Sequence, residues 1–263
     1  MLDGLVAGIV AFIAAFDPLT AVRLGISMTL LQASIGMLND LIDAPRDADR
    51  VPPKPIPAGL VTSSTARTGV VVAASLGLAL AVPSGPATLG LALVVLGIGY
   101  GYDRYAKGTA WSWVPFALGI PLLPVYGWLG AAGELPSFFA LLVPVAMLAG
   151  TALAIANALA DLERDTAAGT ASIARRLGRE RAWSVHAWLL WAVLLLAYAA
   201  MISVGAHSLA IGGATVGSVI VAYAASMGRE GGPERRKRMW ELEAVGLAFL
   251  AVAWVAGMVT APA

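Results

Sequence analysis

The sequence predicts an all-α, polytopic membrane protein with about nine transmembrane helices. Of its 263 residues, 59% are hydrophobic and 13% are charged, whereas soluble domains average about 45–50% apolar and about 25% charged residues. The apolar residues form long blocks, and the charged residues gather in the short stretches between them. Blocks of this length are typical of membrane-spanning helices. We expect residues 1–263 to form one membrane domain.

The composition also excludes several classes of function. The sequence has no cysteine and only two histidines, which excludes disulfides, thiolate nucleophiles and cysteine-based metal sites. A net charge of +1, with basic residues spread over short loops, argues against nucleic acid as a partner. The first residues lack the basic start of a secretory signal peptide.

Nine apolar stretches follow one another along the chain. They lie at residues 4–16, 20–41, 66–82, 87–102, 111–129, 136–159, 183–204, 208–226 and 240–259. The first is short for a span of about 20 residues. Prolines between Pro45 and Pro57 end the second helix, and Ser63 to Thr65 offer caps for the third. A turn at Pro83–Pro86 precedes the fourth helix. Three prolines predict a bend in the fifth.

The basic residues support this order of spans. Of the 17 lysines and arginines, all but Arg23 lie in or beside the connections that follow the even-numbered spans. By the positive-inside rule, these connections are cytoplasmic, with the N-terminus inside and the C-terminus outside. We expect the run Arg229–Arg238 to be a solvated topology signal.

An acidic motif ends the second apolar stretch and recurs after the sixth. Both copies read Asn-x-x-x-Asp-x-x-x-Asp, at Asn39, Asp43 and Asp47 and again at Asn157, Asp161 and Asp165. Ionisable residues within membrane segments are costly and mark functional sites by default. Spacing by four predicts one helical face for the second copy. In the first copy, Pro45 places Asp47 in a loop.

Two carboxylate clusters on the same side of the membrane would repel each other without cations. Mg²⁺ prefers such oxygen ligands and is usually shared with substrate phosphates, so the pattern predicts Mg²⁺ ions that hold a diphosphate. Basic residues available for the remaining phosphate charge are Arg50, Lys54, Lys107, Arg175 and Arg176. A diphosphate beside an apolar bundle suits a polyprenyl diphosphate. Aromatic faces can stabilise an allylic cation, and Tyr100, Tyr102 and Tyr126 are candidates.

The motifs resemble those of the UbiA superfamily of intramembrane prenyltransferases. The first match is Asn39-Asp40-x-x-Asp43-x-x-x-Asp47, followed by Lys54-Pro55-Ile56-Pro57-Ala58-Gly59. The second is Asp161-x-x-x-Asp165-x-x-x-Gly169-x-x-Ser172, continuing to Ala174-Arg175-Arg176-Leu177-Gly178, and a weaker third is Tyr102-Asp103 with Lys107. The order, the spacing and the nine-helix topology agree over essentially the whole chain.

The resemblance implies helices bundled around a central cavity with cytoplasmic cap loops, and Mg²⁺-dependent transfer of a prenyl group. It implies a first metal–diphosphate site at Asn39, Asp40, Asp43 and Asp47, and a second at Asp161 and Asp165, beside Asn157. Phosphate contacts are implied for Lys54, Tyr102, Lys107 and Arg175. We expect Asp43, Asp161, Tyr102 and Lys107 to matter most for catalysis.

Two residues depart from the family pattern. Thr166 stands where many members have a basic residue, and no basic residue precedes the first span, where many members that prenylate aromatic acids have an arginine. The acceptor is therefore expected to be lipophilic or aromatic, and a benzoate is disfavoured unless the chain continues before Met1. Two rival functions stay open: a terpene cyclase of the same superfamily, and a transporter, since transporters contain repeats with buried acids.

Overall fold

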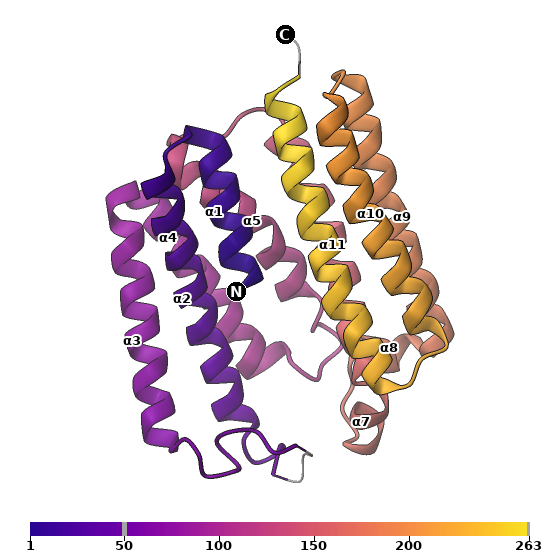
Figure 1. The fold of residues 1–263 in the computed structure, drawn as a ribbon. Coiled ribbons are helices and arrows are strands. Elements are labelled where there is room, and N and C mark those ends of the chain that lie inside the picture. The colour runs from indigo at the N-terminus through magenta and orange to yellow at the C-terminus, as the bar shows by residue number, and fades with distance from the viewer. Residues whose placement is uncertain (49–51, 262–263) are drawn as a thin grey trace. The chain divides into compact units, whose positions relative to one another are not determined.

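The structure, a computed structural model, describes residues 1–48 and 52–261. All regular structure in these residues is helical, which confirms the all-α prediction (Figure 1). Within the same residues, eight helices are long and apolar enough to cross a membrane, and one shorter apolar helix, Leu2–Ala15, precedes them. The predicted nine apolar stretches are therefore all helical, although the first is too short to qualify by length. The chain divides into two compact units.

The first unit comprises residues 1–105 and 122–135. Its helices are α1 (Leu2–Ala15), α2 (Pro18–Asp43), α3 (Ser63–Ala81), α4 (Pro86–Gly101) and the second half of α5 (Val114–Ala132). Asp17 caps α2 by accepting from Leu19 N at 3.0 Å. Thr62 caps α3, so the residues expected as caps lie in the first turn of that helix. Favourable caps let each helix begin at a defined residue.

Two serines fasten α2 to its neighbours in the first unit. Ser27 Oγ donates to Gly77 O at 2.6 Å, and one heptad later Ser34 Oγ donates to Val70 O at 2.8 Å. Each serine also bonds to a tyrosine hydroxyl at 2.6 Å: Ser27 to Tyr126 and Ser34 to Tyr100. Hydrogen bonds between apolar helices help to fix their register. These bonds define the position of α2, whose last turn holds the first acidic motif.

The second unit comprises residues 106–121 and 136–263, of which 106–121 and 136–261 are described. It contains the first half of α5, α6 (Phe139–Ala160), α7 (Leu162–Ala167), α8 (Ile173–Leu177), α9 (Arg179–Ser203), α10 (Ser208–Arg229) and α11 (Pro233–Val259). Helices α10 and α11 approach closely at Gly217, where an added Cβ would lie 2.6 Å from Gly246 O. Small residues permit this backbone contact, as is common in membrane bundles.

A buried ionisable pair joins α9 to α11 inside the second unit. His186 Nε2 lies 3.0 Å from Glu243 Oε2, and both side chains are buried. The Trp183 ring packs edge-on against His186 at 5.6 Å between centroids. Because a buried polar group needs a partner, the contact between His186 Nε2 and Glu243 Oε2 fixes α9 against α11.

Each unit gathers its basic connections at one end. In the first unit, α2 and α4 run in the same direction, and the last turns of α2 meet the segment after α4 through Asn39 and Asp103. In the second unit, Arg179 donates to Arg229 O at 3.4 Å, which joins the start of α9 to the end of α10. This arrangement agrees with the alternation of basic and uncharged connections read from the sequence.

Candidate functional site

The first acidic segment lies at the carboxyl-terminal end of α2. Asp43 is the last residue of that helix, and Asp47 follows one turn later, outside it, as Pro45 predicts. The N–H of Asp47 still donates to Asp43 O at 2.9 Å. The two residues are only 7% and 1% exposed. Since a helix carboxyl terminus disfavours negative charge, these buried carboxylates require positive charge nearby.

Lys54 supplies positive charge to this segment. Its Nζ donates a hydrogen bond of 2.7 Å to Asp40 Oδ1 and forms an ion pair of 2.9 Å with Asp47 Oδ2. Partial burial lowers the pKa of Lys54, but its contacts with Asp40 and Asp47 outweigh burial and hold the pKa above its ordinary value. A cation thus already sits between two motif carboxylates. Of the other predicted diphosphate ligands, Arg50 lies outside the described residues.

Asn39 has a partner that lies outside both acidic motifs. Its Nδ2 donates to Asp103 Oδ1 at 2.6 Å, and Asp103 is only 5% exposed. Asp103 belongs to a π-helix, η2 (Tyr102–Ala106), that follows α4; such segments are frequent at functional sites. The sequence did contain a signal, since Asp103, like the two motifs, is an acid placed directly after an apolar span.

The second acidic segment is interrupted at Asp161. Helix α6 ends at Ala160, Asp161 has φ −96° and ψ 7°, and α7 begins at Leu162. The helix expected to carry Asn157, Asp161 and Asp165 on one face is therefore interrupted at Asp161. The three residues are still one helical turn apart, because Asp161 N donates to Asn157 O at 3.2 Å and Asp165 N donates to Asp161 O at 2.8 Å. Asp161 is exposed to solvent, and Asp165 is half-buried.

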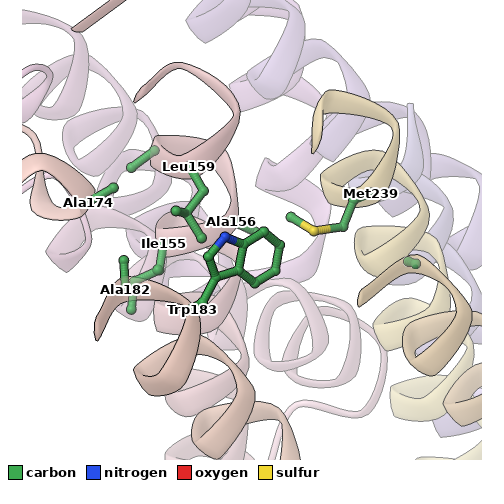
Figure 2. Close-up of a cluster of buried hydrophobic side chains, with 9 residues drawn as sticks. Ile155, Ala156, Leu159, Ala174, Ala182, Trp183 and Met239 are labelled. Atoms are coloured by element: carbon green, nitrogen blue, oxygen red, sulfur yellow. The ribbon is translucent and has the colours of Figure 1, made fainter. Parts of the chain in front are cut away.

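A hydrophobic cluster holds the end of α6 against α8, α9 and α11 (Figure 2). Its labelled members are Ile155, Ala156, Leu159, Ala174, Ala182, Trp183 and Met239. Leu162, directly after Asp161, is partly buried against the same cluster. Burial of apolar side chains therefore anchors the chain immediately on both sides of Asp161.

The backbone next to Lys107 is hydrogen-bonded to the loop that follows the second acidic segment. Gly108, the next residue, accepts a hydrogen bond of 3.0 Å from Ala171 N. The same loop is closed by Thr170 N, which donates to Asp165 O at 3.0 Å, and by the Arg175 side chain, which donates to Thr170 O. The second unit thus brings Asp165, Lys107 and Arg175 into one loop cluster. Tyr102 and Lys54 belong to the first unit.

Arg236 corrects the interpretation of the basic run Arg229–Arg238 as a solvated topology signal. It is the largest fully buried side chain of the described residues, at 1% exposed. It donates to Gly231 O at 3.0 Å and pairs with Glu163, which lies between Asp161 and Asp165 in α7. Arg236 therefore ties the start of α11 to the second acidic segment.

The pair of Arg236 and Glu163 gives a prediction about pH. Desolvation raises the pKa of Glu163, but the Arg236 hydrogen bond and charge outweigh it and hold the pKa below its ordinary value. A carboxyl group whose pKa is lower in the folded than in the unfolded protein stabilises the fold when the pH is above its unfolded-state pKa. This stabilisation is lost as the pH falls through the folded-state pKa. Glu163→Gln should therefore lower the melting temperature at pH 7 and have progressively less effect as the pH approaches 4.

Thermal unfolding in detergent at several pH values measures this difference. The exposed Glu180 of α9 provides the matched control, because Glu180→Gln removes a charge without a buried partner. A Glu163→Gln effect that is as large at pH 4 as at pH 7, or that equals the control, would contradict the charge pairing.

The donor set fits a metal shared with a substrate. Within residues 1–48 and 52–261, no group of three or more histidine, aspartate or glutamate side chains is placed to hold a metal ion alone. Mg²⁺ usually keeps several waters and binds through one or two carboxylates together with substrate phosphates. The oxygens of the first segment, with a cation already accommodated between Asp40 and Asp47, suit that mode.

Known proteins agree with these features. The UbiA prenyltransferase family matches residues 4–253. The chain is 27% identical over 174 residues to digeranylgeranylglyceryl phosphate synthase of Sulfolobus acidocaldarius, a match that spans 65% of this chain and 62% of that protein.

Solved structures show the same fold. A UbiA homolog from Aeropyrum pernix K1 superposes with a TM-score of 0.78 at 18% identity, over 98% of this chain and 96% of its own. A UbiA homolog from Archaeoglobus fulgidus bound to GPP and Mg²⁺ gives a TM-score of 0.70 at 20% identity, over 98% and 95%. The chain is therefore a multi-pass membrane protein that belongs to the UbiA prenyltransferase family.

Proposed function

We propose that the chain is a Mg²⁺-dependent intramembrane prenyltransferase, with residues 1–263 acting as one domain. It transfers an isoprenoid chain from a polyprenyl diphosphate to a lipophilic or aromatic acceptor. The observation that carries the proposal is the buried acidic segment at the end of α2, whose carboxylates already hold the ammonium group of Lys54. The homolog from Archaeoglobus fulgidus that binds GPP and Mg²⁺ supports the same substrate class.

In this proposal, two groups of oxygen ligands hold the metal and the diphosphate. The first group is Asn39, Asp40, Asp43 and Asp47, and the second is Asn157, Asp161 and Asp165. When bound, Mg²⁺ withdraws charge from the diphosphate as the allylic C–O bond breaks. The active site faces the cytoplasm, where the basic connections are expected.

The basic residues neutralise the part of the phosphate charge that the metal does not neutralise. Lys54 exchanges Asp40 and Asp47 for a phosphate oxygen once a metal occupies those carboxylates, so that its ammonium group is never without an anion. Arg50, Lys107 and Arg175 supply further positive charge, and Tyr102 supplies a hydroxyl donor. The apolar helices exclude water, which protects the allylic cation from hydrolysis.

The acceptor we favour is a lipid rather than a benzoate. The relative from Sulfolobus acidocaldarius is a synthase of digeranylgeranylglyceryl phosphate, which supports a phosphorylated glyceryl lipid as the acceptor class.

Product analysis tests this function and separates its rivals. The purified protein in nanodiscs is incubated with Mg²⁺ and farnesyl or geranylgeranyl diphosphate, with and without a geranylgeranylated glyceryl phosphate or 4-hydroxybenzoate. We expect mass spectra to show a prenylated lipid and an equimolar release of pyrophosphate. A free cyclic hydrocarbon would show the cyclase. If no prenyl diphosphate is consumed and the protein instead carries it into proteoliposomes, the protein is a transporter.

A further inference from the structure

We propose that Asp103 is a positioning residue that presents the amide oxygen of Asn39 to the bound cation. The inference rests on the proposed function, because it assumes that the first acidic segment binds a divalent metal. Asp103 lies in the π-helix after α4, outside both acidic motifs. Its role would be to set the orientation of a metal ligand, without contact with the metal.

Chemistry fixes the direction of the bond between Asn39 and Asp103. The amide of Asn39 can offer either its nitrogen or its oxygen to a neighbour. An ionised carboxylate only accepts hydrogen bonds, so the group that faces Asp103 Oδ1 at 2.6 Å is the Nδ2 donor. The carbonyl oxygen of Asn39 is then turned away from Asp103. That oxygen is the only amide atom able to bind a hard cation.

The packing of α2 against α4 holds this bond in register. Ile35 and Gly99 lie in contact four residues before Asn39 and Asp103, and a Cβ on Gly99 would lie 2.3 Å from Ile35 Cδ1. Ser34, which precedes Ile35, and Tyr100, which follows Gly99, share a hydrogen bond of 2.6 Å between their hydroxyl groups. Because α2 and α4 run in the same direction, a step of four residues leads along α2 from Ile35 to Asn39, and from Gly99 of α4 to Asp103 in η2.

Burial strengthens this control of the ligand. Asp103 is 5% exposed and Asn39 is half-buried, so water competes little for the bond, and a hydrogen bond to a charged acceptor is stronger than a neutral one. Residues that orient metal ligands through such bonds typically change metal affinity by about 10–100-fold when they are replaced. Without Asp103, the Asn39 amide would rotate, and its oxygen would face the metal only part of the time.

Titration with Mn²⁺ tests the inference on the full-length protein in the presence of an uncleavable prenyl thiolodiphosphate. The readout is the loss of the free-ion electron paramagnetic resonance signal beyond the loss caused by the analogue alone. Asp103→Leu should weaken Mn²⁺ binding by about tenfold, whereas Asp103→Asn should stay within about twofold, since its side-chain oxygen still accepts from Asn39. In an Asn39→Ala background, Asp103→Leu should have no further effect, because the residue it positions is gone. Melting temperatures without metal report any loss of folding separately.

Each outcome decides one question. Unchanged Mn²⁺ affinity in Asp103→Leu overturns the inference, and so does additivity with Asn39→Ala. Equal losses in Asp103→Asn and Asp103→Leu would show that the charge binds the metal directly, which also overturns a positioning role. If Asp103→Leu fails to fold, the exchange Asn39→Asp with Asp103→Asn decides, because it reverses the donor and should restore binding lost in Asn39→Asp alone. A wild-type protein that takes up no Mn²⁺ beyond the amount bound by the substrate analogue alone would instead refute the metal site of the proposed function.

Discussion

Asp43→Ala and Asp161→Ala are each expected to abolish pyrophosphate release from a prenyl diphosphate, a loss of at least about a hundredfold. Each substitution removes a carboxylate from one of the two proposed metal–diphosphate sites. In the proposed function each site neutralises part of the negative charge on the leaving group, so that either loss would leave this charge insufficiently neutralised as the C–O bond breaks. The measurement is the initial rate of pyrophosphate release in nanodiscs at saturating Mg²⁺.

Controls separate this loss from unfolding. Asp43 is buried, so Asp43→Asn, which keeps the side-chain volume, is measured beside Asp43→Ala. Asp17→Ala removes the cap at the opposite end of α2 and should affect stability without affecting the rate. For the second unit, Glu180→Ala in the first turn of α9 is the matched control. Full activity in either Asp43→Ala or Asp161→Ala would refute the two-site proposal.

Removal of Mg²⁺ is expected to stop the reaction as completely as the two substitutions. The described residues contain no group of three or more acids or histidines placed to hold an ion alone. Metal binding should therefore depend on the substrate: the apparent affinity for Mg²⁺ rises with the concentration of prenyl diphosphate, and the affinity for prenyl diphosphate rises equally with Mg²⁺. Thermal stability should rise more with both ligands together than with either alone.

Chelation with EDTA, followed by titration with Mg²⁺ at several substrate concentrations, measures this coupling. Lys54→Met gives a further comparison, since Lys54 occupies the carboxylates before the metal arrives. Without this competing cation, Mg²⁺ alone should bind more tightly, while the prenyl diphosphate binds more weakly. Turnover that persists after chelation would refute the dependence on Mg²⁺.

Much of the fold followed from features that are local in the sequence. The length of each apolar block predicted the helices, because a helix needs about 20 apolar residues to cross the hydrocarbon core. Pro45 predicted the end of α2 before Asp47, because proline breaks a helix from within. The two acidic motifs stood out since carboxylates are rare at the ends of apolar spans.

The break at Asp161 was not predictable from spacing alone. Asn157, Asp161 and Asp165 fit an ideal helix, yet α6 ends at Ala160 and α7 begins at Leu162. The chain on either side of Asp161 is held by contacts with α8, α9 and α11. A local pattern contains no information about such distant contacts.

The sequence by itself determined the membrane class, the order of the helices and the two acidic motifs, because hydrophobic length, proline and charge act on neighbouring residues. Only the tertiary structure decided how the charges are paired. It placed Lys54 between Asp40 and Asp47, Asp103 beside Asn39, and buried Arg236 against Glu163. Asn39 and Arg236 each find their partner on another helical segment far away in the sequence, and Lys54 finds its own across a loop. These partners come within reach only when the helices pack, and burial then makes each pairing necessary.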